Sequence, residues 1–213
     1  RDDVESRGLG DVYKRQFLDE KHSAAWHISE FETMARTLAG YTKTCVISFI
    51  DLYKKVERNF PEARTVSQKD RLAIGKELIQ IAGQYGMTVK PCAEGSELAA
   101  YGADCSGCMT VETFETALHA SLDVPKKNQN VKNRQCGCML TADIGAYDTC
   151  GHLCRYCYAN SNAALVRENR RKHDPNSPFL IGNAMPGDVI HEADQRSWID
   201  RQMKLELEGL FVS

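Results

Sequence analysis

The sequence predicts an α/β fold, and three successive segments support that prediction. Residues 43–50 read KTCVISFI, a short apolar run rich in β-branched side chains, which is typical of a strand covered on both faces. A helical pattern follows, and residues 87–92 form a second strand-like run. A strand, a helix and a strand in this order form a right-handed crossover between parallel strands. We therefore expect a parallel sheet with helices packed against it.

The segment before the first of these strands carries the signals of an amphipathic helix. Ser23 suits the N-cap position, and Gly40 suits the position after the C-terminus. Between them, apolar side chains recur at the spacing of one helix face: Ile28, Phe31, Ala35 and Leu38. This stripe predicts the face that packs against the sheet.

The helix between the two strands is expected to begin at Ser67-Gln-Lys-Asp70, which resembles a capping box. It should run to about Tyr85, because Gly86 is a suitable stop. The positions that repeat at helical spacing and should face inward are Ile74, Leu78, Ile81 and Tyr85.

Two further helices are expected after residue 110. The first covers residues 111–122, with Val111, Phe114 and Leu118 on one face. The second covers residues 159–172 and ends before Pro175, because the residue preceding proline avoids the helical conformation. Residues 123–135 between them are polar, basic and without periodicity, which predicts an exposed loop; phosphate contact by its cations is the alternative.

The first sixteen residues differ from the rest of the chain. Residues 11–16, DVYKRQ, back-translate to GAT GTG TAT AAG AGA CAG, which looks like the transposon adapter end used in sequencing libraries. Such scars are excluded from fold reasoning, so we expect residues 1–16 to be non-native and to pack against nothing. The chain is then a fragment whose native part begins near Phe17 and lacks its N-terminal portion; a natural disordered tail is the alternative.

Two parts remain: residues 17–122, the C-terminal part of an α/β domain, and residues 123–213, a cysteine-rich segment with a tail.

Composition excludes some classes of protein. The 27 Lys and Arg against 29 Asp and Glu give a net charge of −2, which offers no global electrostatic argument for nucleic acid or an anionic membrane. No apolar run approaches the roughly 20 residues of a membrane span. All nine cysteines except Cys45 lie between Cys92 and Cys157, at metal-like spacings. Such spacing favours a reducing cytoplasm over a secreted disulfide scaffold.

Three cysteines in the C-terminal half form a C-x3-C-x2-C motif, Cys150, Cys154 and Cys157. Soft thiolates at this density favour an iron–sulfur cluster, and three of them can hold a [4Fe–4S] cube with one iron left open. A structural zinc knuckle, with His152 as a further ligand, is the main rival. Plain cysteines are the remaining alternative.

The motif, with Tyr156 just before its last thiol, resembles the cluster-binding motif of radical S-adenosylmethionine (SAM) enzymes. Most of the chain more closely resembles the bacterial family of unknown function DUF1848. The stretches that carry this resemblance are GYTKTCVISFIDLYKK, CAE at residues 92–94, CGCMLTADIGAYDTCGHLCRYCYAN and HDPNSPFLIG.

The resemblance implies a barrel-like parallel sheet, here an incomplete TIM-barrel-like one, and cluster ligation by the three motif cysteines. If SAM binds, Tyr156 is expected near its adenine, and an external electron donor is required. One departure is that radical SAM enzymes carry this motif early, whereas here it follows at least two strands.

Other cysteines could form a second site. Cys92 ends a predicted strand, and CxxC (residues 105–108) and CxC (residues 136–138) motifs follow. Four such thiols could hold a second cluster or a zinc ion, and the family resemblance favours Cys92, Cys108, Cys136 and Cys138. A mixture of buried and spare thiols is the alternative. Cys45, within a strand, is expected in the core.

Two acidic residues, Asp51 and Glu94, each fall just past the C-terminal end of a predicted strand. That edge of an α/β sheet hosts ligand and catalytic groups, so both are candidates for contacting substrate or moving protons. Capping of the next turn is the alternative for Asp51.

Together these observations predict an iron–sulfur protein, a radical-SAM-like enzyme of unknown substrate. Cys150, Cys154 and Cys157 should converge beside a cavity that Asp51 and Glu94 also line. The alternative is a non-catalytic module stapled by zinc or a cluster, with nucleic acid as a weakly supported ligand.

Overall fold

A computed structural model describes residues 11–126, 137–139, 145–191 and 196–201. Its centre is a parallel three-stranded sheet in the order β1-β2-β3, formed by β1 (Asp11–Gln16), β2 (Thr44–Phe49) and β3 (Thr88–Pro91). The predicted α/β class and the pairing of the two predicted strands are confirmed, with Thr44 opposite Thr88. The strands that the structure describes form an open sheet, so the predicted barrel is not shown.

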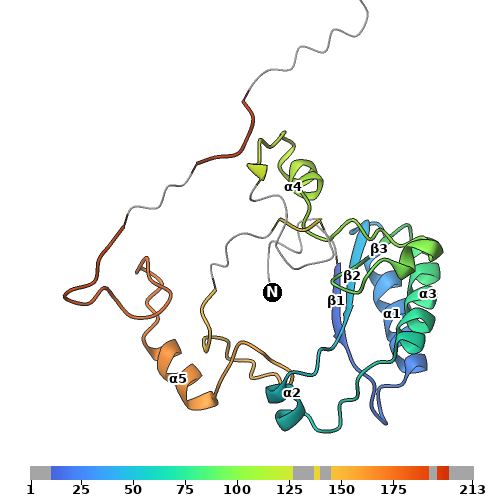
Figure 1. Cartoon of the computed structure of the whole chain (residues 1–213), viewed down its shortest axis with the longest axis horizontal. Coiled ribbons are helices and arrows are strands. Elements are labelled where there is room, and N and C mark those ends of the chain that lie inside the picture. Colours follow the sequence, from blue (N-terminus) through green and yellow to red (C-terminus); the bar gives the residue numbers. More distant parts are fainter. Residues whose placement is uncertain (1–10, 127–136, 140–144, 192–195, 202–213) are drawn as a thin grey trace, which may run out of the picture.

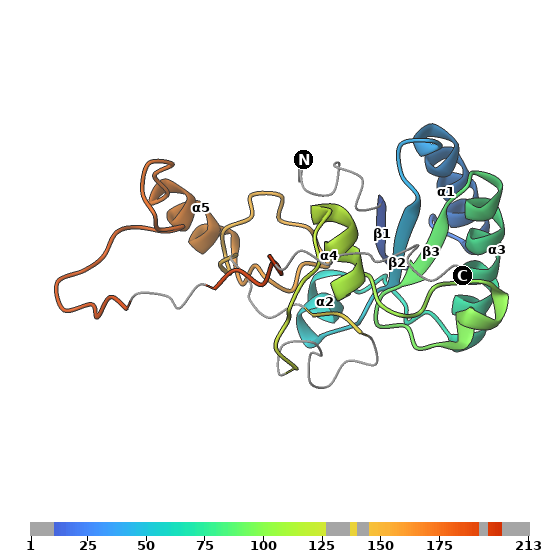
Figure 2. The same cartoon turned by 90° about the horizontal axis from the view of Figure 1, so that it is seen from above.

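Two helices, α1 (Ala24–Leu38) and α3 (Gln68–Gln84), cover the same face of the sheet and pack against each other (Figures 1 and 2). The main core lies between these helices and the strands. Its fully buried members include Phe31 of α1, Ile47 of β2 and Leu78 of α3. Cys45 belongs to this core, as predicted. The alternation along β2 sends Val46 to the opposite face, where it meets cysteine side chains.

Both helices begin as their sequences predict. The hydroxyl of Ser23 accepts a hydrogen bond from Trp26 N, and the hydroxyl of Ser67 accepts one from Asp70 N at 3.1 Å. The Ser67 hydroxyl also donates to the Asp70 carboxylate at 2.7 Å. These caps satisfy backbone donors that would otherwise lack partners in the first turn.

Strand β1 contradicts the expectation that residues 1–16 pack against nothing. Asp11, Val12 and Tyr13 pair in parallel with Cys45, Val46 and Ile47 of β2, and Gln16 is buried. The expectation rested on a codon pattern, which carries no information on strand pairing. An open strand edge with unpaired backbone groups accepts any segment that can extend along it. Residues 1–10 lie outside the described part of the chain.

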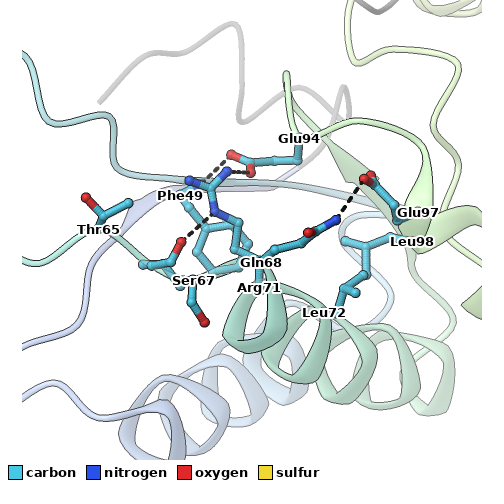
Figure 3. A pocket seen from close by; sticks show the side chains of 10 residues that line it. Phe49, Thr65, Ser67, Gln68, Arg71, Leu72, Glu94, Glu97 and Leu98 are labelled. Atoms are coloured by element: carbon cyan, nitrogen blue, oxygen red, sulfur yellow. Dashed lines mark hydrogen bonds and ion pairs between the residues drawn. The ribbon is translucent and has the colours of Figure 1, made fainter.

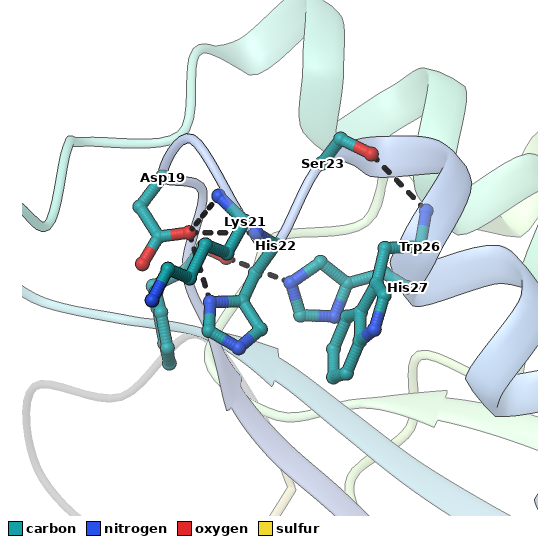
Figure 4. A network of polar contacts seen from close by, with 7 residues as sticks. Asp19, Lys21, His22, Ser23, Trp26 and His27 are labelled. Carbon is teal, nitrogen blue, oxygen red and sulfur yellow. Dashed lines mark hydrogen bonds and ion pairs between the residues drawn. The ribbon is translucent and has the colours of Figure 1, made fainter.

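A polar network ties the end of β1 to the start of α1 (Figure 4). One carboxylate oxygen of Asp19 accepts hydrogen bonds from Lys21 N at 2.8 Å and His22 N at 2.6 Å. The His27 ring lies 2.7 Å from Phe17 O through Nε2, and burial lowers the pKa of this histidine. His27 therefore has a structural role, because it joins α1 to the chain segment after β1.

Several further elements lie outside the sheet. They are α2 (Lys54–Asn59), the 3-10 helix η2 (Glu97–Tyr101), α4 (Val111–Leu118) and α5 (Ala163–Arg171). Helix α4 ends earlier than predicted because His119 adopts a left-handed conformation, and Leu118 is 53% exposed rather than buried. In the part of the chain that the structure describes, no helix has the length and apolarity needed to cross a membrane.

Candidate metal sites

The C-x3-C-x2-C motif lies on a segment that we call the cysteine loop, residues 148–161. Cys150 and Cys154 are exposed, Cys157 is half-buried, and all three thiols are free. Both ends of the loop are tied together: the Asp148 carboxylate accepts hydrogen bonds from Ser161, and the Asn160 amide donates to Cys150 O at 2.8 Å. The loop thus presents three soft ligands on a closed backbone turn.

The two residues between Cys154 and Cys157 anchor the loop to the segment after β2. Arg155 donates to Asn59 O at 3.1 Å, pairs with Glu62 at 2.6 Å and lies over the Phe60 ring. Tyr156 packs against a cluster formed by Ile50, Val56, Phe60 and Ala63. Tyr156, expected near the adenine of SAM, therefore contributes to the hydrophobic contact that positions the loop.

A pocket of about 440 Å³ lies elsewhere, around Glu94, and a second one of about 280 Å³ lies beside the cysteine loop. The pocket beside the loop is lined by Thr149, which precedes Cys150, and by Asn169, Arg170 and His173 at the end of α5. Arg170 also lies against the loop backbone, because a side chain at Gly151 would meet its guanidinium at 3.2 Å. A cavity with cationic and hydrogen-bonding groups thus adjoins the motif.

The described structure does not gather Cys150, Cys154 and Cys157 into a set of metal ligands. No three His, Cys, Asp or Glu side chains within the described ranges meet the geometry of a formed metal site. The predicted convergence of the three thiols is therefore not seen. The donor set still suits an iron–sulfur cluster, because three free thiols lie within eight residues, at least two of them open to solvent.

A second group of thiols lies beside Val46, on the face of the sheet opposite α1 and α3, and it includes Cys92 just after the end of β3. We call Cys92, Cys108 and Cys138 the sheet-end cysteines. Cys108 Sγ is 3.8 Å from Cys92 Sγ and 3.7 Å from Cys138 Sγ. Three of the four residues predicted for a second site therefore lie together. The fourth, Cys136, is outside the described residues.

Close backbone packing brings the sheet-end cysteines together. Gly137 N donates to Ser106 O at 2.9 Å, and Met139 N donates to Met109 O at 2.8 Å. A Cβ atom at Gly137 would lie 2.7 Å from Ser106 O, and one at Gly107 would lie 3.1 Å from Cys138 N. Gly107 also has a φ of 127°, which glycine adopts without strain. The two glycines inside the CxxC and CxC motifs are thus needed for the approach of the two segments.

Lys90 of β3 fixes the same region from the sheet. Its ammonium forms an ion pair with Asp104 at 2.8 Å and donates to Gly107 O at 3.3 Å. Burial raises the pKa of Asp104, but hydrogen bonds from Lys90 and Ser106 and the charge of Lys90 outweigh it and bring the pKa to about 2. Cys105 has a different environment, where burial raises the pKa of its thiol.

Of the two predicted acidic residues only Glu94 lines the pocket of about 440 Å³, although burial, and after it the negative charge of Asp51, raises the pKa of Glu94. Glu94 accepts from Phe49 N at 2.7 Å and pairs with Arg71 at 3.0 Å, in the pocket that Ser67, Gln68 and Glu97 also line (Figure 3). Burial raises the pKa of Glu94, against the lowering effects of these two contacts. Asp51 is exposed, and neither it nor any cysteine lines the Glu94 pocket. Asp51, Glu94 and the motif cysteines were predicted to line one cavity, and the pocket around Glu94 is not such a cavity.

Sequence reasoning did not identify Arg155, Arg170, Gly107 or Gly137. The position of Gly107 and Gly137 inside cysteine motifs was a usable signal, because metal-binding loops need close backbone approach. No local sequence signal marked Arg155 or Arg170. The partners of Arg155, Asn59 and Glu62, are more than 90 residues away in the sequence, and Arg170 meets the loop at Gly151.

The family model described as "Domain of unknown function (DUF1848)" matches residues 13–159, which is more than half of the chain. The match covers the sheet except the first two residues of β1, and it includes the sheet-end cysteines and the motif cysteines. No curated protein and no solved structure matches the chain.

Proposed function

The chain belongs to the DUF1848 family, and from this premise we propose that it is an iron–sulfur protein, a radical-SAM-like enzyme with its cluster on Cys150, Cys154 and Cys157. The observation that carries the proposal is the cysteine loop itself. Three free thiols at C-x3-C-x2-C spacing lie on a turn closed by Asp148 and Asn160, beside a pocket. Three thiolates leave one iron of a [4Fe–4S] cube open for a small ligand.

Each residue of the cysteine loop named here has its own role in that proposal. Cys150, Cys154 and Cys157 would ligate the cluster. Arg155 and Tyr156 hold the loop against the segment that follows β2. When bound and reduced, such a cluster supplies the electron for cleavage of SAM, and an external donor would supply that electron to it.

The pocket beside the loop gives the proposal a place for a ligand. Arg170 lines it and lies against the loop backbone at Gly151, and His173 lines it as well. A guanidinium suits a carboxylate or phosphate group, because its donors form a rigid fork. We therefore expect the molecule that binds beside the cluster to carry an anionic group, as the carboxylate of SAM does.

Two broader expectations belong to the same proposal. The sequential strand order, with α1 and α3 on one face, is how the wall of a β/α barrel is built, and we propose that the sheet is part of a barrel-like arrangement. The three motif cysteines are free thiols, which suits a reducing cytoplasm.

Anaerobic reconstitution tests the cluster. The chain and its Cys105→Ser variant should bind about four iron and four sulfide ions, whereas Cys154→Ser should lose most of both. Cys105 is the matched control because it lies outside the loop. Stoichiometric zinc without sulfide in the wild-type chain would instead favour the non-catalytic binding module.

A second assay tests the chemistry. The reduced, cluster-loaded chain and a homologue from the family are incubated with SAM, and 5′-deoxyadenosine is measured. Product from the wild-type proteins but not from the Cys154→Ser variants supports the radical-SAM-like reaction. A loaded homologue that forms none contradicts it and leaves an electron-transfer or structural cluster.

A further inference from the structure

The distances between the sheet-end cysteines distinguish between two kinds of metal site. Cys108 Sγ lies 3.8 Å from Cys92 Sγ and 3.7 Å from Cys138 Sγ. Two thiolates on one tetrahedral metal ion, with bonds of about 2.3 Å, are separated by about 3.8 Å. The ligands of a [4Fe–4S] cube bind different irons and are therefore farther apart. The two observed distances are therefore compatible with ligands of a single ion and too short for ligands of a cube.

The framework around these thiols is rigid before any ion is bound. Cys108 is 8% exposed and Cys138 is 2% exposed, and both pack against Val46 of β2. Cys92 N donates to Ile47 O at 2.8 Å, which continues the pairing between β3 and β2. Each thiol thus comes from a separate segment that backbone hydrogen bonds hold in place.

From these observations we propose that the sheet-end cysteines bind one structural zinc ion, separate from the cluster of the cysteine loop. Zinc prefers tetrahedral thiolate sites that are closed to solvent, and such sites contribute to folding stability. The ion would join the end of β3 to the CxxC and CxC segments. Cys92 and Cys138 each contact Cys108, but the three thiols do not surround a common point in the described structure. Binding therefore requires Cys92 and Cys138 to turn toward one ion.

The CxxC motif supplies one ligand to this site, not two. Cys105 forms no thiol contact with Cys92, Cys108 or Cys138 in the described structure, and its thiol lies near the Ala99 backbone, Asp104 and Glu97 instead. Cys105→Ser is therefore a matched control for Cys108→Ser, since both change one thiol of the same motif.

Cobalt binding tests the proposal in a chain that cannot form the loop cluster. In a variant with Cys150, Cys154 and Cys157 all changed to serine, one equivalent of Co²⁺ should produce thiolate-to-cobalt charge-transfer bands and tetrahedral d–d bands. Excess Zn²⁺ should remove them. Adding Cys108→Ser should weaken cobalt affinity more than about 100-fold, while adding Cys105→Ser should leave it unchanged. Circular dichroism checks that each variant is folded.

The outcomes separate this site from the proposed function, because the loop cysteines are absent throughout. Bands that survive Cys108→Ser, or no bands in the parent variant, overturn the zinc site. If Cys108→Ser does not fold, Cys92→Ser gives the same test from a half-buried position at the end of the sheet. Retention of the bands in a folded Cys92→Ser variant would also overturn it.

Discussion

The sheet-end cysteines and the cysteine loop hold the same chemical group in opposite settings. Cys108 and Cys138 are buried against β2, and glycine contacts fix their backbone. Cys150 and Cys154 are exposed on a turn that Arg155 attaches to the segment after β2. A closed thiol site suits a structural ion, whereas an accessible one beside a pocket suits a metal centre that must exchange a ligand. Burial and backbone contacts, rather than cysteine spacing alone, separate the two proposed roles.

Removal of metal should give the largest difference between the two regions. With zinc at about 1,000 times its Kd, the wild-type chain should gain about 4 kcal/mol in free energy of unfolding over the chelated chain. The variant lacking Cys150, Cys154 and Cys157 should keep this gain, and Cys108→Ser should lose it. Urea unfolding with and without chelator measures the effect. An equal gain in Cys108→Ser would place the stabilising ion elsewhere.

Gly137→Ala should disturb the sheet-end cysteines without changing a thiol. Its new Cβ would lie 2.7 Å from the backbone oxygen of Ser106, so the two segments must separate. We expect a loss of about 1–3 kcal/mol in the free energy of unfolding, with weaker cobalt binding. Gly83→Ala is the control, because its Cβ meets nothing within 4 Å and alanine favours the helix by about 0.5–1 kcal/mol. Similar effects of the two variants would contradict the close packing.

Arg155→Ala should loosen the cysteine loop at a smaller cost of about 1 kcal/mol, because its ion pair with Glu62 is largely exposed. Hydrogen exchange in residues 150–158 should accelerate, while exchange in β2 stays unchanged. Lys172→Ala is the control, since that residue pairs within α5 and is equally exposed. Unchanged exchange in the loop would show that the Arg155 contacts are not needed to hold it.

The pH dependence contributed by Asp104 should be the smallest effect, because its carboxylate is more than a third exposed. Its pKa is about 2 in the folded chain against an ordinary value of 3.8. The folded state therefore gains stability from the ionised carboxylate above 3.8 and loses it as the pH falls toward 2. In Asp104→Asn, the free energy of unfolding measured with urea should therefore fall less steeply as the pH is lowered below 3.8. An unchanged slope would show that other carboxylates cause the loss of stability in acid.

Local signals explain why part of the fold could be predicted. Helices α1 and α3 have serine caps and regular apolar stripes, and β2 is a short, mostly apolar run, so each was predicted close to its bounds. Helix α2 was missed because it is six residues long and Tyr53 offers no side-chain cap. Strand β1 was missed because its pairing depends on the exposed edge of β2, which its own residues do not encode.

In the candidate sites, too, local signals could be read from the sequence and tertiary contacts could not. Spacing and family resemblance indicated the motif cysteines and the three sheet-end cysteines. The position of Glu94 just after a predicted strand correctly placed it at the C-terminal edge of the sheet. Spacing could not tell that Cys108 meets two thiols while Cys105 meets none of the sheet-end group. Nor could it show that Glu94 pairs with Arg71 from a helix 23 residues away. Such contacts depend on tertiary packing.

The central position of Cys108 has a consequence for oxidation. A sulfur atom can form a disulfide bond with one partner at a time, and both Cys92 and Cys138 lie within reach of small side-chain movements. Air oxidation of the metal-free chain should therefore yield two competing disulfide isomers, each leaving one sheet-end thiol unpaired. A bound ion would hold all three sulfurs as thiolates and protect them. Purification under reducing conditions, or with zinc present, should accordingly give a more homogeneous protein than purification in air without metal.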